Sequence, residues 1–153
     1  MQLNELIHYF REDLFLPNIQ SKTKDALLDE MVEPLLSHEL IKNKRVILET
    51  LKKRETLGST GIGHGVAIPH CRTLSVSDVQ LVVGLSSEGV EYDALDKKPV
   101  HLFFLIVAPP QEKSNLYLPI LGKLVELLRD ENLRKQLQSV KTFHEFTTAL
   151  LGE

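Results

Sequence analysis

The sequence has only one cysteine and no long apolar run. Because Cys71 is alone among 153 residues, the chain cannot form an internal disulfide and offers no cysteine pair to zinc. No apolar stretch approaches the roughly 20 residues that a membrane-spanning helix needs, and charged residues occur within the first dozen positions. We therefore expect a cytoplasmic protein of a reducing compartment, with no direct membrane insertion.

An excess of positive charge is also lacking. The 18 Lys and Arg residues are outnumbered by 21 Asp and Glu residues, which gives a formal net charge of -3. Basic runs interleaved with aromatic residues, which are typical of a nucleic-acid groove, do not occur. With 42% hydrophobic residues and no repeat or long linker, the chain fits one globular domain over residues 1–153. We expect no nucleic-acid partner.

Apolar periodicity predicts helices on both sides of a group of strands. After a short LNELI helix and an apolar LFLP segment, helical spacing occurs over residues 21–36, 43–54, 114–128 and 143–151. Ser21 is expected to cap the first of these four helices, and Pro34 to end or kink it. Three β-rich runs, VAIPH, VQLVVGLS and VHLFFLIVA, lie between the second and third helices. This order predicts an α/β fold with helices on both faces of a central sheet.

The stretch GSTGIGHGVAIPHCR, residues 58–72, concentrates the candidate chemistry. Glycines allow positive φ and a close approach of backbone N–H groups to an anion, and two hydroxyls add donors. Ser59, Thr60 and Gly61 are therefore predicted to bind phosphate. The stretch lacks the lysine of a nucleotide-binding P-loop and the GxGxxG spacing of a dinucleotide site, so we expect no cofactor. The alternative is that the glycines only form a tight connection between helix and strand.

His70 ends the apolar run VAI, and Pro69 restricts the backbone beside it. A neutral imidazole next to a donor-rich loop has the properties of a nucleophile that captures a phosphoryl group. A purely structural histidine is the alternative. His64, between two glycines, is interpreted as a loop or partner-surface residue. No histidine spacing matches a metal site, so no metal is expected.

Longer stretches carry a resemblance to a known family. RETLGSTGIGHGVAIPHCR, YDALDKKPVHLFFLIVAP and the helix LGKLVELL resemble the enzyme IIA domains of the fructose/mannitol class of the bacterial phosphoenolpyruvate-dependent phosphotransferase system. The resemblance implies a single-domain α/β sandwich with a mixed sheet. It also implies that His70 is phosphorylated and that Arg54 steadies the phosphoryl group.

The implied donor is the phosphocarrier HPr or its nitrogen-branch relative, and the transfer is metal-independent. An enzyme IIB domain or a regulatory target would follow. Because no IIB or membrane IIC segment is attached, the sequence looks most like the free-standing nitrogen-regulatory members. Tyr117 stands where the family commonly has a second active-site histidine, and we expect its helix to begin at Ser114 or Asn115.

Several alternatives stay open at this point. Arg54 could simply compensate the dipole at a helix C-terminus, and Glu55 is left outside the catalytic set. Cys71 should be a small buried filler rather than a nucleophile. An apolar collar for partner docking is expected among three residues beside Tyr117: Leu116, Leu118 and Ile120. The competing functions are a non-covalent anion-sensing binding module and a metal hydrolase, for which His64 and His70 supply too few ligands.

Overall fold

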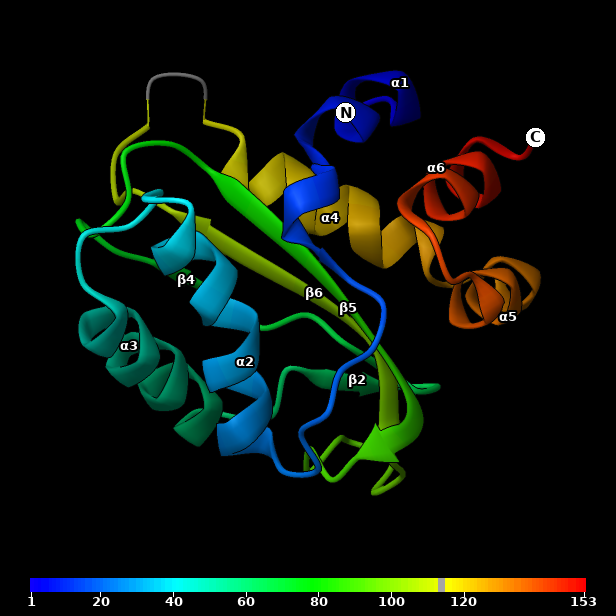
Figure 1. The fold of residues 1–153 in the computed structure, drawn as a ribbon, viewed down its shortest axis with the longest axis horizontal. Coiled ribbons are helices and arrows are strands. Elements are labelled where there is room, and N and C mark those ends of the chain that lie inside the picture. Colours follow the sequence, from blue (N-terminus) through cyan, green and yellow to red (C-terminus); the bar gives the residue numbers. More distant parts are fainter. Residues whose placement is uncertain (113–114) are drawn as a thin grey trace.

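A mixed six-stranded sheet lies at the centre of the protein (Figure 1). The computed structural model covers residues 1–153 and describes all of them except 113 and 114. The strands are β1 (Phe15–Leu16), β2 (Gly61–Gly63), β3 (Val66–Ala67), β4 (His70–Arg72), β5 (Gln80–Val90) and β6 (Val100–Ala108). Their order is β1-β5-β6-β3-β2, with β4 also paired to β6. β5 runs antiparallel to β6, whereas β3 and β4 run parallel to it. The predicted mixed sheet is therefore confirmed.

Helices cover both faces of this sheet (Figure 1). They are α1 (Leu3–Leu6), α2 (Lys24–Ser37), α3 (Lys44–Thr56), α4 (Tyr117–Leu127), α5 (Glu131–Ser139) and α6 (Phe143–Leu151), with short 3-10 turns at Ile7–Tyr9 and Glu12–Leu14. α2 and α3 lie against one face, and α1, α4, α5 and α6 lie against the other. The sandwich expected from the sequence is confirmed.

The alternating side chains of β6 explain why both faces need helices. Phe103 and Leu105 belong to the hydrophobic cluster that includes α2 and α3. Phe104 and Ile106 belong to the opposite cluster, which includes α4 and α6. Because successive side chains of a strand point to opposite faces, a continuously apolar strand requires an apolar layer on each side. All four of these residues are fully buried.

The first two long helices begin at side-chain caps. The Thr23 side chain accepts a hydrogen bond from the Ala26 N–H, so Thr23 caps α2 rather than the predicted Ser21, whose hydroxyl donates to Glu30. The α2 helix also continues past Pro34 to Ser37. A proline removes one intrahelical N–H, which the final turn of a helix can tolerate. Asn43 caps α3 as the 43–54 pattern indicates.

The run VAIPH is not one strand as predicted, because β3 ends at Ala67 and β4 begins at His70. The two strands lie one after the other along the same side of β6, with Ala67 opposite Phe103 and His70 opposite Ile106. Pro69 has no N–H to donate, yet its carbonyl oxygen accepts from the Ile106 N–H at 3.0 Å. The ladder is thus interrupted without an inserted residue.

The helix predicted from Ser114 to Leu128 begins later than expected, and a further helix that was not predicted follows it. The α4 helix starts at Tyr117 with Leu116 as its N-cap residue, while Ser114 lies outside the described residues. Asp130 then caps a separate helix, α5, which the sequence analysis did not predict. The last helix, α6, has the predicted bounds. Among the described residues, no helix has the length and hydrophobicity needed to cross a membrane.

At Gly61 the backbone lies very close to the segment that contains Ala94 and Leu95. A Cβ atom at this position would be 2.8 Å from Cα and Cβ of Ala94, and the Gly61 carbonyl accepts from the Leu95 N–H at 2.8 Å. Gly61→Ala should therefore lower the free energy of unfolding in urea by about 1–3 kcal/mol, as overpacking does. Gly122→Ala is the matched control, because a Cβ there meets no atom within 4 Å. Equal stability of the two variants would contradict the close approach.

Candidate active site

Three of the predicted site residues line one cleft. His70 from β4, Arg54 from α3 and Tyr117 from α4 border a cavity of about 580 Å³. The other lining residues are Thr50, Lys53, Thr56, Leu57, Cys71, Arg72, Leu118 and Leu121. The cleft lies where α3 ends and α4 begins. β4, which carries His70 and Arg72, pairs with β6 at the same end of the sheet. Its charged lining residues are all cationic: Lys53, Arg54 and Arg72.

The His70 ring is fixed by its own backbone. Nδ1 lies 2.7 Å from the Ile68 carbonyl oxygen. Because a carbonyl oxygen only accepts hydrogen bonds, Nδ1 carries the proton, and Nε2 keeps its lone pair when the ring is neutral. His70 is half-buried and lines the cleft. Nε2 is therefore the ring nitrogen left for chemistry in the cleft.

The surroundings of His70 favour the neutral imidazole. Burial is the largest cause and lowers the pKa of His70 below its ordinary value of 6.5. The Arg54 charge lowers the pKa further, whereas the hydrogen bond to Ile68 and the Glu55 charge act in the opposite direction. Near neutral pH the ring therefore has an unprotonated nitrogen.

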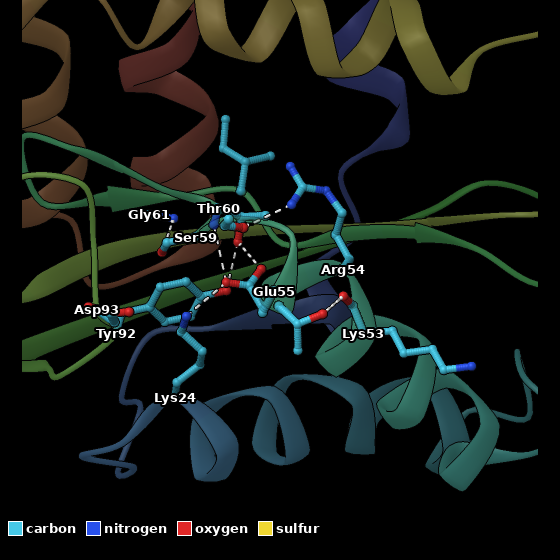
Figure 2. Close-up of polar contacts among 12 residues, drawn as sticks. Lys24, Lys53, Arg54, Glu55, Ser59, Thr60, Gly61, Tyr92 and Asp93 are labelled. Carbon is cyan, nitrogen blue, oxygen red and sulfur yellow. Dashed lines mark hydrogen bonds and ion pairs between the residues drawn. The ribbon is translucent and has the colours of Figure 1, made fainter.

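Arg54 lies in the last turn of α3, where its charge also suits the helix dipole. Its Nη1 donates to the Gly58 carbonyl oxygen at 2.9 Å. Figure 2 shows the guanidinium extending away from Glu55, its neighbour in the sequence. The side chain is thus a helix-end cation that also borders the cleft of His70.

Tyr117 is the first residue of α4 and is 7% exposed. Its ring centroid lies 6.1 Å from that of His70. Its backbone N–H donates to Oε1 of Glu112 at 2.5 Å, which holds the start of the helix. Burial raises the pKa of Tyr117 to about 12, so its hydroxyl stays protonated and can donate one hydrogen bond.

Ser59, Thr60 and Gly61 do not line the cleft of His70. The Thr60 N–H and hydroxyl both donate to Glu55, at 3.1 and 2.5 Å. The Gly61 N–H donates to Oγ of Ser59 at 3.0 Å. In this conformation the donors of Thr60 and Gly61 are already used within the protein. Their direct binding of phosphate stays a prediction.

Glu55 is the centre of a buried polar cluster that the sequence pattern did not indicate (Figure 2). Its side chain is 7% exposed and accepts from Thr60, while its Oε1 lies 3.0 Å from Nζ of Lys24. The Thr60 hydroxyl also lies 2.9 Å from the hydroxyl of Tyr92, a fully buried residue. Burial raises the pKa of Tyr92, so its phenol stays neutral. The cluster anchors the glycine loop to the end of α3.

Arg72 is a further cleft residue that the sequence analysis missed. Residues two apart in a strand face the same way, so the spacing from His70 could have indicated it. Its Nη1 donates to the Pro110 carbonyl oxygen at 2.9 Å, and its guanidinium carbon lies 4.5 Å from the Tyr117 ring centroid. Cys71, between His70 and Arg72, belongs to the core cluster on the α3 side. Cys71 is 5% exposed, as predicted for a small buried filler, and burial raises the pKa of its thiol to about 12.

The apolar collar differs partly from the prediction. Leu118 is 58% exposed and Leu57, which was not predicted, is 84% exposed, and both line the cleft. Ile120 is fully buried in the core and is therefore not part of a collar. His64 is exposed on the glycine loop, with φ of 56°, as predicted for a loop residue. Within the described residues, no group of three or more potential ligands is placed to hold a metal.

Residues 8–152 match the model of the family "Phosphoenolpyruvate-dependent sugar phosphotransferase system, EIIA 2". The chain belongs to this EIIA 2 family. It is 42% identical over 120 residues to the fructose-specific EIIABC component of Bacillus subtilis, covering 78% of this chain and 19% of that protein. It is 38% identical over 106 residues to a nitrogen regulatory protein homolog of Haemophilus influenzae, covering 68% of this chain and 64% of that protein. The chain thus spans only part of these relatives.

The fold of this EIIA 2 chain is also similar to solved structures. The nitrogen regulatory protein IIA-Ntr from Neisseria meningitidis superimposes with a TM-score of 0.86 and 29% identity, covering 95% of this chain and 99% of that one. The sandwich that positions His70 is therefore shared with a IIA protein.

The environment of His70 in this EIIA 2 chain predicts its titration. We expect the His70 ring, followed by NMR, to titrate with a midpoint below 6.5, because burial and the Arg54 cation disfavour the imidazolium. Arg54→Gln should raise this midpoint, since it removes a positive charge near the ring. Arg45→Gln is the control, because Arg45 is an exposed residue at the other end of α3 that pairs with Glu49. A wild-type midpoint at or above 6.5 would count against a desolvated ring.

Proposed function

We propose that this protein accepts a phosphoryl group on Nε2 of His70 from phospho-HPr or its nitrogen-branch relative. It then passes the group to an enzyme IIB domain or uses its phosphorylation state for regulation. The observation that carries the proposal is the His70 ring, whose Nδ1 is held by Ile68 and whose Nε2 is left for a cleft with cationic charge. Membership of the EIIA 2 family supports the same chemistry.

The transfer step requires no base in the cleft. The Nε2 lone pair attacks phosphorus, a bond from nitrogen to phosphorus forms, and the bond from phosphorus to the donor breaks with its electron pair leaving on the donor. Positive charge spreads over the ring as the new bond forms. The hydrogen bond from Nδ1–H to the Ile68 carbonyl favours that charge, as it also favours the protonated ring. The proton on Nδ1 stays in place throughout.

Arg54 and Tyr117 are proposed to bind the phosphoryl oxygens. A guanidinium has several N–H donors, and only one from Arg54 is used at the Gly58 carbonyl. Tyr117 can add a neutral donor from the other side of the cleft. For Ser59, Thr60 and Gly61 the contacts support a positioning role, because the Glu55 cluster holds the loop whose Gly58 carbonyl receives Arg54. Transfer is proposed to need neither metal nor cofactor.

Exposed leucines at the cleft support docking of a protein partner. Leu57 and Leu118 border the cleft and are mostly exposed. Small exposed apolar patches of this kind suit transient contact with another protein. Relatives named for fructose and for nitrogen regulation support the two proposed fates of the phosphoryl group, which are transfer to a IIB domain and regulation.

The function is tested by incubating the purified protein with phosphoenolpyruvate, enzyme I and HPr. We expect a mass increase of one phosphoryl group that is labile to acid and stable to base, and its loss in His70→Ala. His64→Asn is the control, because asparagine tolerates the positive φ of this exposed position. Normal labelling of His70→Ala would reject the assignment. A protein that binds phosphate but gains no mass would instead be a non-covalent anion-sensing module.

Arg54 should matter more for transfer than for stability. Loss of one preorganised donor typically slows a reaction by about 10²–10³, so Arg54→Ala should accept the phosphoryl group from phospho-HPr at a correspondingly reduced rate. Arg54→Lys should recover only part of the rate, because lysine lacks the guanidinium fork. Arg45→Ala serves as the matched charge deletion on the same helix. An unchanged rate of transfer by Arg54→Ala would show that Arg54 only compensates the dipole at the C-terminus of α3.

A further inference from the structure

Arg72 brings a second guanidinium to the cleft from the same strand as His70. In β4, His70 lies opposite Ile106 and Arg72 opposite Ala108, and both of these β6 residues belong to the cluster on the α4 side. Cys71, between them, lies opposite Val107 and belongs to the cluster on the α3 side. The strand therefore directs His70 and Arg72 to the same face, where α4 begins with Tyr117.

Two contacts hold the Arg72 guanidinium without neutralising it. One N–H donates to the Pro110 carbonyl oxygen at 2.9 Å, and the guanidinium carbon lies over the Tyr117 ring, 4.5 Å from its centroid. A guanidinium has five N–H donors, so the contact with Pro110 leaves donors for an anion. The cation–π contact uses the face of the ring and leaves the Tyr117 hydroxyl free to donate. The cation is thus preorganised at the wall of the cleft.

The charge of Arg72 has no carboxylate partner in the described part of the chain, and the same holds for Arg54. By contrast, Arg11 pairs with Asp13 and Arg45 pairs with Glu49. The nearby carboxylate of Glu55 is turned to Lys24 and Thr60 instead. Two unneutralised guanidiniums in one cleft, both bound to backbone carbonyls, form a site suited to a dianion.

We propose that Arg72 is a second phosphoryl-binding residue, which acts with Arg54 while the phosphoryl group is on His70. This inference rests on the proposed function. A phosphoryl group carries about two negative charges near neutral pH, which two guanidiniums match. Tyr117 can donate a hydrogen bond but cannot become a cation. Its ring instead contacts the Arg72 guanidinium and serves as a platform that positions this cation. In support, the charges of both Arg72 and Arg54 act on the pKa of Tyr117, lowering it against the effect of burial.

Arg72 is tested with two phosphoryl donors. Phosphoramidate is a small donor that needs no docked protein, and phospho-HPr is the protein donor. Arg72→Gln should slow phosphorylation of His70 by about 10- to 100-fold with both donors, the range expected for one hydrogen bond to a charged group. Arg72→Lys should be intermediate, because it keeps the charge and loses the fork. Arg129→Gln, at an exposed arginine beyond the far end of α4, should retain the wild-type rates.

The outcomes separate this inference from the proposed function. Wild-type rates of Arg72→Gln with phosphoramidate, while His70 is labelled normally, overturn the role of Arg72 and leave the function of His70 intact. A loss confined to phospho-HPr would make Arg72 a docking residue and would also overturn the proposal. If wild-type His70 takes up no phosphoryl group from either donor, the proposed function fails together with this inference. Thermal unfolding of each variant shows whether the fold is retained.

The platform role of Tyr117 has its own test with the same assay. Tyr117→Phe keeps the ring beneath Arg72, whereas Tyr117→Leu removes it. Tyr117→Leu should be slower than Tyr117→Phe when Arg72 is present, and this difference should shrink in an Arg72→Gln background, because residues in contact are energetically coupled. The same difference in both backgrounds would show that the ring does not position Arg72.

Discussion

The position of the candidate site depends on the interruption of one strand at Pro69. Because proline has no N–H, the ladder between β3 and β6 stops at Ala67 and resumes at His70 as β4, still parallel to β6. Beside this interruption, the Ile68 carbonyl oxygen lies 2.7 Å from Nδ1 of His70. One local constraint thus sets the place of the histidine, its tautomer and the nitrogen that faces the cleft.

The end of α3 directs two neighbouring side chains of opposite charge to different places, which keeps the carboxylate out of the cleft. Glu55 is turned into the protein, where Lys24 and the Thr60 hydroxyl satisfy it, and Arg54 extends to the cleft (Figure 2). A carboxylate in the cleft would neutralise the arginines and repel a phosphoryl group. Burying Glu55 avoids both effects, and the same carboxylate fastens the glycine loop. The electrostatics of the site and the structure of the loop therefore depend on one side chain.

The sequence predicted those features that depend on local pattern. Apolar periodicity identified α2, α3 and α6, and the continuous apolar run VHLFFLIVA indicated a strand covered on both faces. His70 and Arg54 were predicted from the loop and the resemblance, and they do line one cleft. The break at Ile68 and Pro69 was missed because the apolar pattern continues through it. Only pairing with β6 shows that VAIPH forms two strands.

Features that depend on distant contacts were harder to predict. The burial of Glu55 requires Lys24 and Tyr92, which are far from it in sequence, and the contact between Arg72 and Tyr117 joins two elements across the cleft. The donors of Thr60 and Gly61 looked available for an anion because the sequence does not show which internal acceptors they meet. Composition and spacing identify candidate donors, whereas tertiary packing decides which of them are already occupied.

The length of β4 has a consequence for self-association. This strand has three residues, and in the described part of the chain it pairs with β6 alone, so its other edge has no strand partner. An open edge can template pairing with another chain, and proteins limit this risk by keeping such strands short and placing charged side chains on them. Arg72 supplies such a charge, and β4 begins only after Pro69, which has no N–H to donate. Arg72, which is proposed to bind the phosphoryl group, thereby also disfavours pairing of another chain with this edge of the sheet.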